Sequence, residues 1–401
     1  MKLELLEILR CPFCGGTLTP DGEKPLELYD GALLNGMLEC YCGKYPVVAG
    51  IPVMQVDYVA ETALHELEQG HSEAALFALL ELDEEKQEDF RAILRGDEPT
   101  TYRAAIELLS PDAEGTYFIY RFSDPTFLAS QAVVRAVGQR FADKRVIDLC
   151  GGSGHLTRTL CQLTSEVVLA DTGFAKLWLA QRFTAPQCSP ICCDANNPLP
   201  FAEESFSLVV CSDAFHYIWS KRLLACEMMR LAGAHGTVLL PHVHNAEGEN
   251  YSAGMPLEPQ HYRALFANHH ARLFRESTVL VGFLKGAGLD FTQDETDDAL
   301  RDEAALVLIA SQQRDLFRRY EPLQPQTLAG NVGLNPLYRV TTEGGQLHLE
   351  LQFPSEIYAE EFAACLRYLP ARLTLRASDI HPHNEELLRQ FVLLDLPLGY
   401  C

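Results

Sequence analysis

Residues Val146–His155 read VIDLCGGSGH, and this stretch decides the fold. An apolar run ends in an acidic residue, passes through a glycine-rich turn, and enters a segment with apolar side chains at Leu156, Leu160 and Leu163. Glycine lets a backbone approach a ligand closely and adopt dihedral angles that other residues avoid. The stretch therefore predicts a strand, a ligand-binding turn and an amphipathic helix.

Three further apolar runs follow, and each of them ends in polar residues. They are Val167–Asp171, Ile191–Ala195 and Phe206–Cys211, the last of which continues into Ser212–His216. Strands that alternate with helices form a parallel sheet, and ligands bind at the carboxyl ends of its strands. The chain therefore belongs to the α/β class, with a ligand site along one edge of the sheet.

The glycine turn differs from two common phosphate-binding turns. A dinucleotide-binding turn needs a third glycine where this chain has Thr157, and a P-loop needs a lysine that is absent here. The turn instead resembles the first motif of class I S-adenosylmethionine-dependent methyltransferases, which reads acidic-x-Gly-x-Gly-x-Gly. Asp148, Gly152 and Gly154 match this motif, while Cys150 stands where the first glycine is usual. The alternative is a glycine-rich turn that binds no ligand.

The resemblance extends over about residues 118 to 311 and includes Pro198–Val210, which is similar to the L-P-F…S-F-D-x-V segment of small-molecule methyltransferases. It implies that Asp171 binds the ribose hydroxyls and that Asp194 and Ala195 receive the adenine amino group. Each aspartate alone could equally be a turn residue or a helix cap. The implied cofactor-binding residues are Asp148, Cys150, Gly151, Gly152, Gly154, Asp171, Thr172, Asp194, Ala195 and Ser212.

Methyl transfer to a protonated acceptor needs a general base near the methyl group. His216 follows the fourth strand, close to the expected methyl position, and the usual pKa of histidine suits a base. We therefore predict that His216 is the catalytic base, with His242 and Asp213 in reserve. The alternative is a histidine that only shapes the pocket.

Four cysteines near the amino terminus form two close pairs, Cys11 with Cys14 and Cys40 with Cys42. Paired thiolates fit a tetrahedral zinc site, which supplies folding free energy to a short segment. The segment resembles the small zinc-ribbon subunit that activates eukaryotic tRNA, rRNA and release-factor methyltransferases, and that also occurs fused to bacterial methyltransferases. The second pair has one intervening residue rather than the commoner two. Disulfides, or a ribbon that has lost its zinc, are the alternatives.

The composition is that of a cytoplasmic enzyme. The 401 residues carry a formal net charge of −23 and no basic cluster, which argues against binding to nucleic acid or to an anionic membrane surface. No signal peptide and no membrane-spanning stretch are apparent. The chain has 13 cysteines, and most of those outside the two pairs lie in apolar segments and are expected to be reduced.

The predicted domains follow from these signals. Residues 1–56 form a zinc ribbon, 57–117 a helical linker or lid, and 118–311 a Rossmann-like methyltransferase domain with seven strands. A substrate-binding insertion is expected near 241–275, and 312–401 form a small α+β domain. This last domain could bind a carrier or protein partner, or form a homodimer contact.

Two more predictions concern the second half of the catalytic domain. The sixth and seventh strands are expected at Leu289–Phe291 and Ala305–Ala310. In the insertion, His242 and His244 would lie on one face of a strand and could bind a second metal. Packing histidines are the favoured interpretation, because no third ligand lies at a suitable spacing.

The sequence therefore predicts an S-adenosylmethionine-dependent methyltransferase that also binds Zn²⁺. The expected acceptor is a small metabolite or natural-product intermediate, methylated on oxygen, nitrogen or carbon. The second hypothesis is an RNA or protein methyltransferase, because the zinc ribbon resembles that of enzymes with such substrates. The third is a scaffold that binds the cofactor without catalysis.

Overall fold

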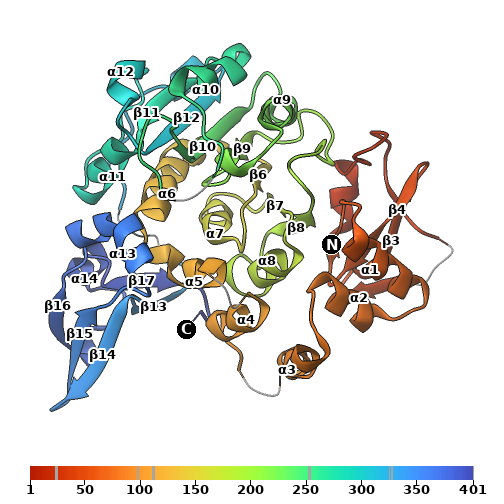
Figure 1. Ribbon diagram of the computed structural model, residues 1–401, viewed down its shortest axis with the longest axis horizontal. Coiled ribbons are helices and arrows are strands. Elements are labelled where there is room, and N and C mark those ends of the chain that lie inside the picture. Colours follow the sequence, from red (N-terminus) through yellow and green to blue (C-terminus); the bar gives the residue numbers. More distant parts are fainter. Residues whose placement is uncertain are drawn as a thin grey trace.

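The computed structural model describes residues 1–22, 26–96, 99–110, 113–251, 254–324, 326 and 328–400. Residues 97, 98, 111, 112, 252, 253, 325, 327 and 401, which fall inside the predicted lid, insertion and carboxyl-terminal domain, lie outside this description. A seven-stranded sheet forms the middle of the molecule (Figure 1). Its strands are β6 (Val146–Leu149), β7 (Val167–Asp171), β8 (Ser189–Cys192), β9 (Leu208–Val210), β10 (Thr237–His244), β11 (Arg272–Arg275) and β12 (Ala305–Ser311).

The order of the strands across this sheet is β11-β12-β10-β9-β6-β7-β8. Strands β6 to β10 run parallel, whereas β12 pairs antiparallel with β10 and with β11. The first strand along the chain, β6, therefore lies between β7 and β9, so that the chain order reverses there. A crevice opens at such a reversal, at the carboxyl ends of the strands. The predicted parallel α/β sheet is confirmed.

One predicted strand is wrong. The sixth strand of the sheet is β11, at Arg272–Arg275, and not Leu289–Phe291. The segment around Asp290 makes only a single antiparallel bridge to Arg319, although Leu289 and Phe291 are buried. An edge strand has one neighbour, so it tolerates an arginine at each end: Arg272 donates to the Thr292 carbonyl and Arg275 pairs with Glu295. These charges led to the assignment of β11 to the insertion.

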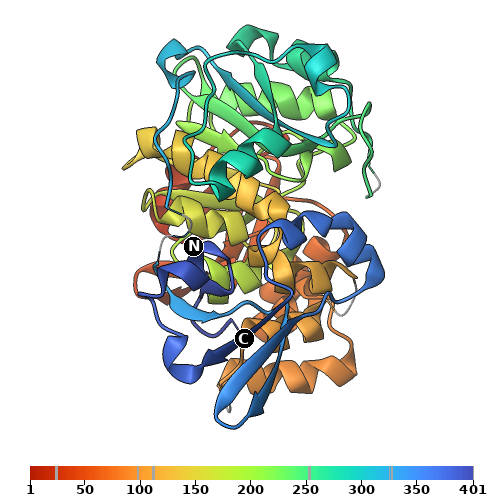
Figure 2. The ribbon, with the colours of Figure 1, turned by 90° about the vertical axis from the view of Figure 1, so that its left-hand side faces the viewer.

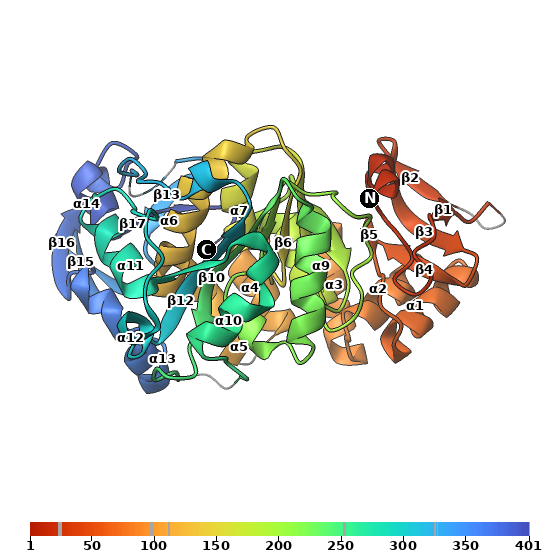
Figure 3. The ribbon, with the colours of Figure 1, turned by 90° about the horizontal axis from the view of Figure 1, so that it is seen from above.

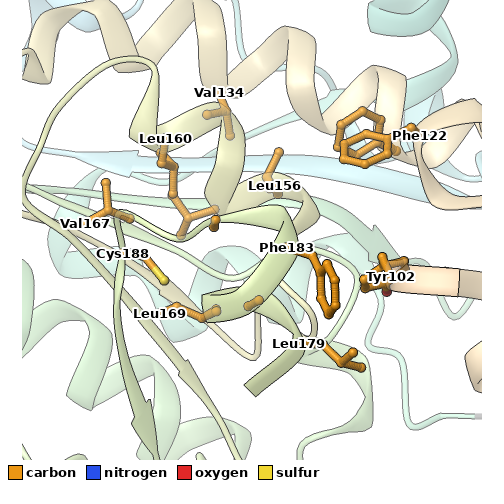
Figure 4. Packing of buried hydrophobic residues seen from close by; sticks show 14 of the residues in the cluster. Tyr102, Phe122, Val134, Leu156, Leu160, Val167, Leu169, Leu179, Phe183 and Cys188 are labelled. Atoms are coloured by element: carbon orange, nitrogen blue, oxygen red, sulfur yellow. The ribbon is translucent and has the colours of Figure 1, made fainter. Parts of the chain in front are cut away.

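Helices cover both faces of the sheet. Side chains of β7 alternate between the faces, so that Val167 and Leu169 join one apolar cluster while Val168 and Ala170 join the other. Figure 4 shows Leu160 beside the first pair. The helices that follow or precede these strands are α6 (Pro125–Gly138), α7 (His155–Cys161), α8 (Phe174–Leu179), α9 (Lys221–Ala232), α10 (Pro259–Leu265), α11 (Glu276–Leu284) and α12 (Asp297–Leu300).

The amino-terminal domain is an antiparallel sheet that covers the β8 edge of the central sheet (Figure 3). Met54 N–H donates to the Cys192 carbonyl at 2.7 Å, and Arg10 N–H donates to the Pro200 carbonyl at 2.9 Å. These bonds satisfy backbone groups that an edge strand would leave open. The strands of this domain are β1 (Thr19–Pro20), β2 (Glu27–Tyr29), β3 (Ala32–Cys40), β4 (Gly43–Val48) and β5 (Ile51–Pro52).

A run of helices connects this domain to the central sheet. Helix α3 is capped at both of its ends. The Asp83 carboxylate accepts the backbone N–H of Lys86 at 2.9 Å at the start, and Gly96 terminates the helix with φ of 70°. The helices are α1 (Tyr58–Glu68), α2 (Ser72–Leu79), α3 (Glu84–Arg95), α4 (Tyr102–Leu109) and α5 (Ala113–Tyr120). No helix of the described ranges is long and apolar enough to span a membrane.

The carboxyl-terminal residues form an α+β unit that packs beside the connecting helices (Figure 2). A hairpin forms around Gly344 and Gly345, which have φ of 58° and 80°. A helix that Asn384 caps ends at Arg389, and the chain then forms a strand that pairs with β13. The elements are β13 (Asn331–Leu334), β14 (Tyr338–Glu343), β15 (Gln346–Leu351), α13 (Glu356–Glu361), β16 (Arg372–Arg376), α14 (Glu385–Arg389) and β17 (Leu393–Leu396).

Tyr400 joins this unit to His155, which directly follows the glycine turn. Its ring stacks on Tyr102 with centroids 4.7 Å apart, and its hydroxyl lies 2.9 Å from His155 Nε2. The same hydroxyl donates to the Phe118 carbonyl at 2.8 Å. Because His155 is the first residue of α7, the carboxyl-terminal residues support the helix that begins at the turn.

We predict that Tyr400→Ala lowers the free energy of unfolding by about 3–5 kcal/mol, since it removes a buried aromatic ring and its hydrogen bonds. The exposed neighbour Leu398 provides the matched control: Leu398→Ala is expected to change stability by less than about 0.5 kcal/mol. Denaturant unfolding of both variants measures the difference. Equal stabilities would contradict the role given to Tyr400.

Candidate active site

A cavity of about 630 Å³ opens at the carboxyl ends of β6, β7, β8 and β9. An aspartate from each strand end lines it, and α5 and residues up to Phe127 close its other side. The lining includes all the predicted cofactor residues except Gly154, which precedes α7 behind the turn. Small-molecule and cofactor sites have volumes in this range. Contact between these residues and a cofactor stays a prediction.

The glycine turn takes backbone conformations that few side chains tolerate. Gly152 and Gly154 have φ of 55° and 79°. A Cβ atom on Gly152 would lie 2.8 Å from the ring of Phe118, so this position needs glycine for space as well. Cys150 also lies in the left-handed region, at φ 56°. The departure from the usual glycine therefore leaves the backbone conformation in place, at a cost in strain.

Asp171 ties the turn to the neighbouring strand. Its Oδ2 accepts the backbone N–H of Gly152 at 2.9 Å, and its Oδ1 accepts the N–H of Gly173 at 2.8 Å. The next residue, Thr172, donates from its hydroxyl to the side-chain oxygen of Gln55 at 3.1 Å. The end of the amino-terminal domain thus reaches the rim of the cavity.

Asp148 lines the cavity and has one buried carboxylate oxygen without a hydrogen bond from any described residue. Its Oδ2 accepts the Thr157 hydroxyl at 2.7 Å, while its buried Oδ1 has no hydrogen-bond partner among the described residues. Burial raises the pKa of Asp148 to about 7, against the lowering effect of the Thr157 bond. An uncompensated buried carboxylate is costly, and a cationic donor in the cavity would relieve this cost.

The remaining predicted residues hold their strand ends in place. Asp194 accepts the backbone N–H of Asn196 at 2.9 Å and the side-chain amide of Asn197 at 2.9 Å. Ser212 donates to the hydroxyl of Ser130, on α6, at 3.0 Å. Asp194 and Ser212 therefore combine a structural bond with a place on the cavity wall.

Acidic groups outnumber basic ones around the cavity. The two basic side chains, Lys176 and Arg121, already pair with Glu114 at 2.6 Å and with Asp213 at 3.2 Å. This balance favours a cationic ligand over an anionic one. The acidic lining residues are Glu114, Asp148, Asp171, Asp194, Asp213 and Glu361.

His216 lies behind the wall of the cavity and does not line it. The chain turns at Phe215–Tyr217 and directs the fully buried ring onto His244, with centroids 3.6 Å apart. Burial, and then the neighbouring His244, lower the pKa of His216 to about 3. Its role as a general base stays a prediction, and it requires the ring to reach the cavity.

The sequence analysis missed a buried polar network beside the expected methyl position. Tyr117 donates to Asp213 Oδ2 at 2.6 Å, and Arg121 pairs with both Asp213 and Asp124. Asp124 also caps α6 by accepting the N–H of Phe127 at 2.6 Å. Burial lowers the pKa of Arg121, but the two carboxylates outweigh it and raise the pKa. The Asp-Pro pair at 124–125 was the available signal for the cap.

The four amino-terminal cysteines come together as predicted. Sγ of Cys11 lies 3.3 Å from that of Cys42, and Cys40 lies 3.5 Å from Cys42 and 4.0 Å from Cys14. Sulfur atoms around one zinc, with bonds of about 2.3 Å, lie roughly 3.8 Å apart. The cluster therefore fits a tetrahedral metal ion.

Comparison with known proteins agrees with this geometry. Residues 146–236 match the family model described as a methyltransferase domain. A search of curated proteins with this sequence finds no match. The matched segment runs from the start of β6 almost to β10 and contains the glycine turn and the ends of four strands. The chain therefore contains a methyltransferase domain over this segment.

Several solved methyltransferase structures are similar to this chain. One is an S-adenosylmethionine-dependent methyltransferase from Mesorhizobium loti (14% identity, TM-score 0.33, covering 45% of this chain and 97% of that one). Another is geranyl diphosphate C-methyltransferase from Streptomyces coelicolor (11% identity, TM-score 0.36, covering 45% of this chain and 76% of that one). A third belongs to the complex of the Haloferax volcanii Trm112 methyltransferase activator with a methyltransferase (18% identity, TM-score 0.34, covering 45% of this chain and 88% of that one).

The raised pKa of Asp148 leads to a prediction. Folded protein keeps a proton that the unfolded chain releases above about pH 4, so the Asp148 contribution destabilises the fold as pH rises toward 7. Asp148→Asn removes this contribution. From pH 5 to pH 8 the cofactor-free variant is expected to gain about 2–3 kcal/mol relative to wild type, measured by denaturant unfolding. Parallel pH profiles of the two proteins would contradict this prediction.

Proposed function

We propose that this enzyme transfers a methyl group from S-adenosylmethionine to a small-molecule acceptor bound in the same cavity. The observation that carries the proposal is the acid-lined cavity of about 630 Å³ at the strand ends, with the unpaired buried oxygen of Asp148 at its wall. The cofactor carries an ammonium group and a sulfonium centre, so it suits this lining. Its bound form supplies an electrophilic methyl group.

The chain itself aligns and shields the reactants. Asp171 and the glycine turn would hold the nucleoside, and Asp194 with Ala195 would receive the adenine. Tyr117 and Arg121 line the opposite wall and would shield the methyl position from solvent when both reactants are bound. Alignment of this kind is the main contribution a protein makes to a displacement at carbon.

The charge around the cavity supports a neutral or cationic acceptor of small size. An RNA substrate would bring phosphates toward six lining carboxylates, on a chain of net charge −23. A natural-product or metabolite acceptor meets no such repulsion.

We also propose that the four clustered cysteines hold Zn²⁺ and that the ribbon is a structural domain. The sulfur–sulfur separations of 3.3–4.0 Å support this. Four thiolates leave zinc no open position, so the ion stabilises the fold and takes no part in methyl transfer.

The cofactor proposal predicts that wild-type protein binds S-adenosylmethionine and S-adenosylhomocysteine in calorimetric titrations. Asp171→Asn is expected to weaken binding about 10- to 100-fold, because a charged acceptor is lost at the turn. Asp290→Asn is the control, since its carboxylate pairs with Arg319 outside the cavity. Absence of binding to the wild type would favour a scaffold without catalysis.

The zinc proposal predicts that Cys14→Ser lowers the metal content by one equivalent per chain and lowers the melting temperature. Cys226 is an exposed cysteine outside the cluster, so Cys226→Ser should leave the metal content unchanged. Elemental analysis of the purified proteins measures both. Equal metal contents in wild type and Cys14→Ser would contradict the assignment.

A further inference from the structure

A second cluster of metal-binding side chains lies at the end of β9 and β10. One donor atom each from Asp213, His242 and His244 lie within 4.8 Å of one another. His242 Nε2 is 3.6 Å from Asp213 Oδ1, and the rings of His242 and His244 have centroids 5.2 Å apart. Asp213 supplies the third ligand that the spacing of the two histidines alone did not reveal.

The separation of His242 from Asp213 suits two ligands of one ion better than a direct hydrogen bond. At 3.6 Å the nitrogen and oxygen are beyond hydrogen-bonding distance. Two donors bonded to one ion at about 2.1 Å, with a tetrahedral angle between them, lie roughly 3.4 Å apart. The distance between His242 and Asp213 therefore corresponds to the edge of a coordination polyhedron.

The groups behind the donors already orient them. His242 Nδ1 lies 2.9 Å from both carboxylate oxygens of Glu276, which leaves Nε2 directed at Asp213. Tyr117 and Arg121 contact Oδ2 of Asp213, which leaves Oδ1 directed at the histidines. Metal-binding histidines usually donate their second ring nitrogen to a carboxylate in this way.

Buried nitrogens without partners give an independent indication of a missing ligand. His244 Nδ1 and both ring nitrogens of His216 have no hydrogen-bond partner in the described part of the chain. His244 is 5% exposed and His216 is fully buried. Of these nitrogens, only that of His244 belongs to the three-residue cluster, and an ion pair of His242 with Asp213 and Glu276 would leave it without a partner.

Charge at the cluster has the sign that a cation requires. Arg121 is a single positive charge that pairs with Asp124 and Asp213, and Glu276 adds a third carboxylate beside His242. With neutral histidines, the carboxylates exceed the guanidinium by two charges. A dication would neutralise this excess in a buried setting, where unpaired charge is costly.

We propose that Asp213, His242 and His244 form a binding site for a first-row transition-metal dication, distinct from the four-cysteine cluster. Two histidines and one carboxylate leave coordination positions open. Because Asp213 also lines the cavity, the ion would lie at the cavity wall. The proposal depends on these side chains and not on the identity of the methyl acceptor.

The test uses the full-length protein, produced with Co²⁺ as the only added transition metal. Wild type is expected to hold two cobalt ions per chain, of which only the cysteine-bound ion shows thiolate-to-cobalt charge-transfer bands. His244→Ala should lose the ion without these bands and keep the other. Glu276→Gln should weaken the second site about 10- to 100-fold, because it removes the carboxylate that orients His242.

His261→Ala is the matched control, because this histidine is exposed and pairs only loosely with Glu258 at 3.8 Å. It should keep both ions. The proposal fails if the wild type binds only the cysteine-bound cobalt ion, which is the one with thiolate charge-transfer bands. This outcome does not require any variant to fold. It also fails if His244→Ala keeps the second ion. Binding of S-adenosylmethionine, measured on the same samples, tests the proposed function separately.

Discussion

The carboxylate of Asp171 is the interaction on which the site depends. It accepts backbone N–H groups from the glycine turn after β6 and from the start of α8 after β7. Two neighbouring strands are thereby held to one geometry at their carboxyl ends. The turn itself leaves little freedom, because Gly152 lies against Phe118 and Cys150 is fixed in a left-handed conformation.

The amino-terminal domain and the carboxyl-terminal unit both contact residues next to this turn. Gln55, just after the last strand of the amino-terminal domain, contacts Thr172, and Tyr400 contacts His155 at the start of α7. The catalytic sheet therefore lies between two domains that each contact its glycine turn or the neighbouring strand end. Neither domain behaves as a loosely attached module, since buried hydrogen bonds join both of them to the central sheet.

The sequence predicted the features that depend on local pattern. Apolar runs ending in Asp148, Asp171 and Asp194 placed the parallel strands and the edge where the cavity opens. Features that depend on contacts between distant segments were not predictable. The pairing of Tyr117 with Asp213 joins residues 96 positions apart. The position of the His216 ring was not predictable for a related reason, because the ring stacks on His244, 28 residues further along the chain.

The amino-terminal domain also protects the central sheet from other chains. Backbone bonds from Met54 and Arg10 cover the β8 side, where an exposed parallel strand would otherwise offer unpaired amide groups. Unfolding of that small domain would expose the β8 edge strand beside the cavity, where its backbone could pair with another chain. Self-association of the chain is then linked to the folding of its first fifty residues.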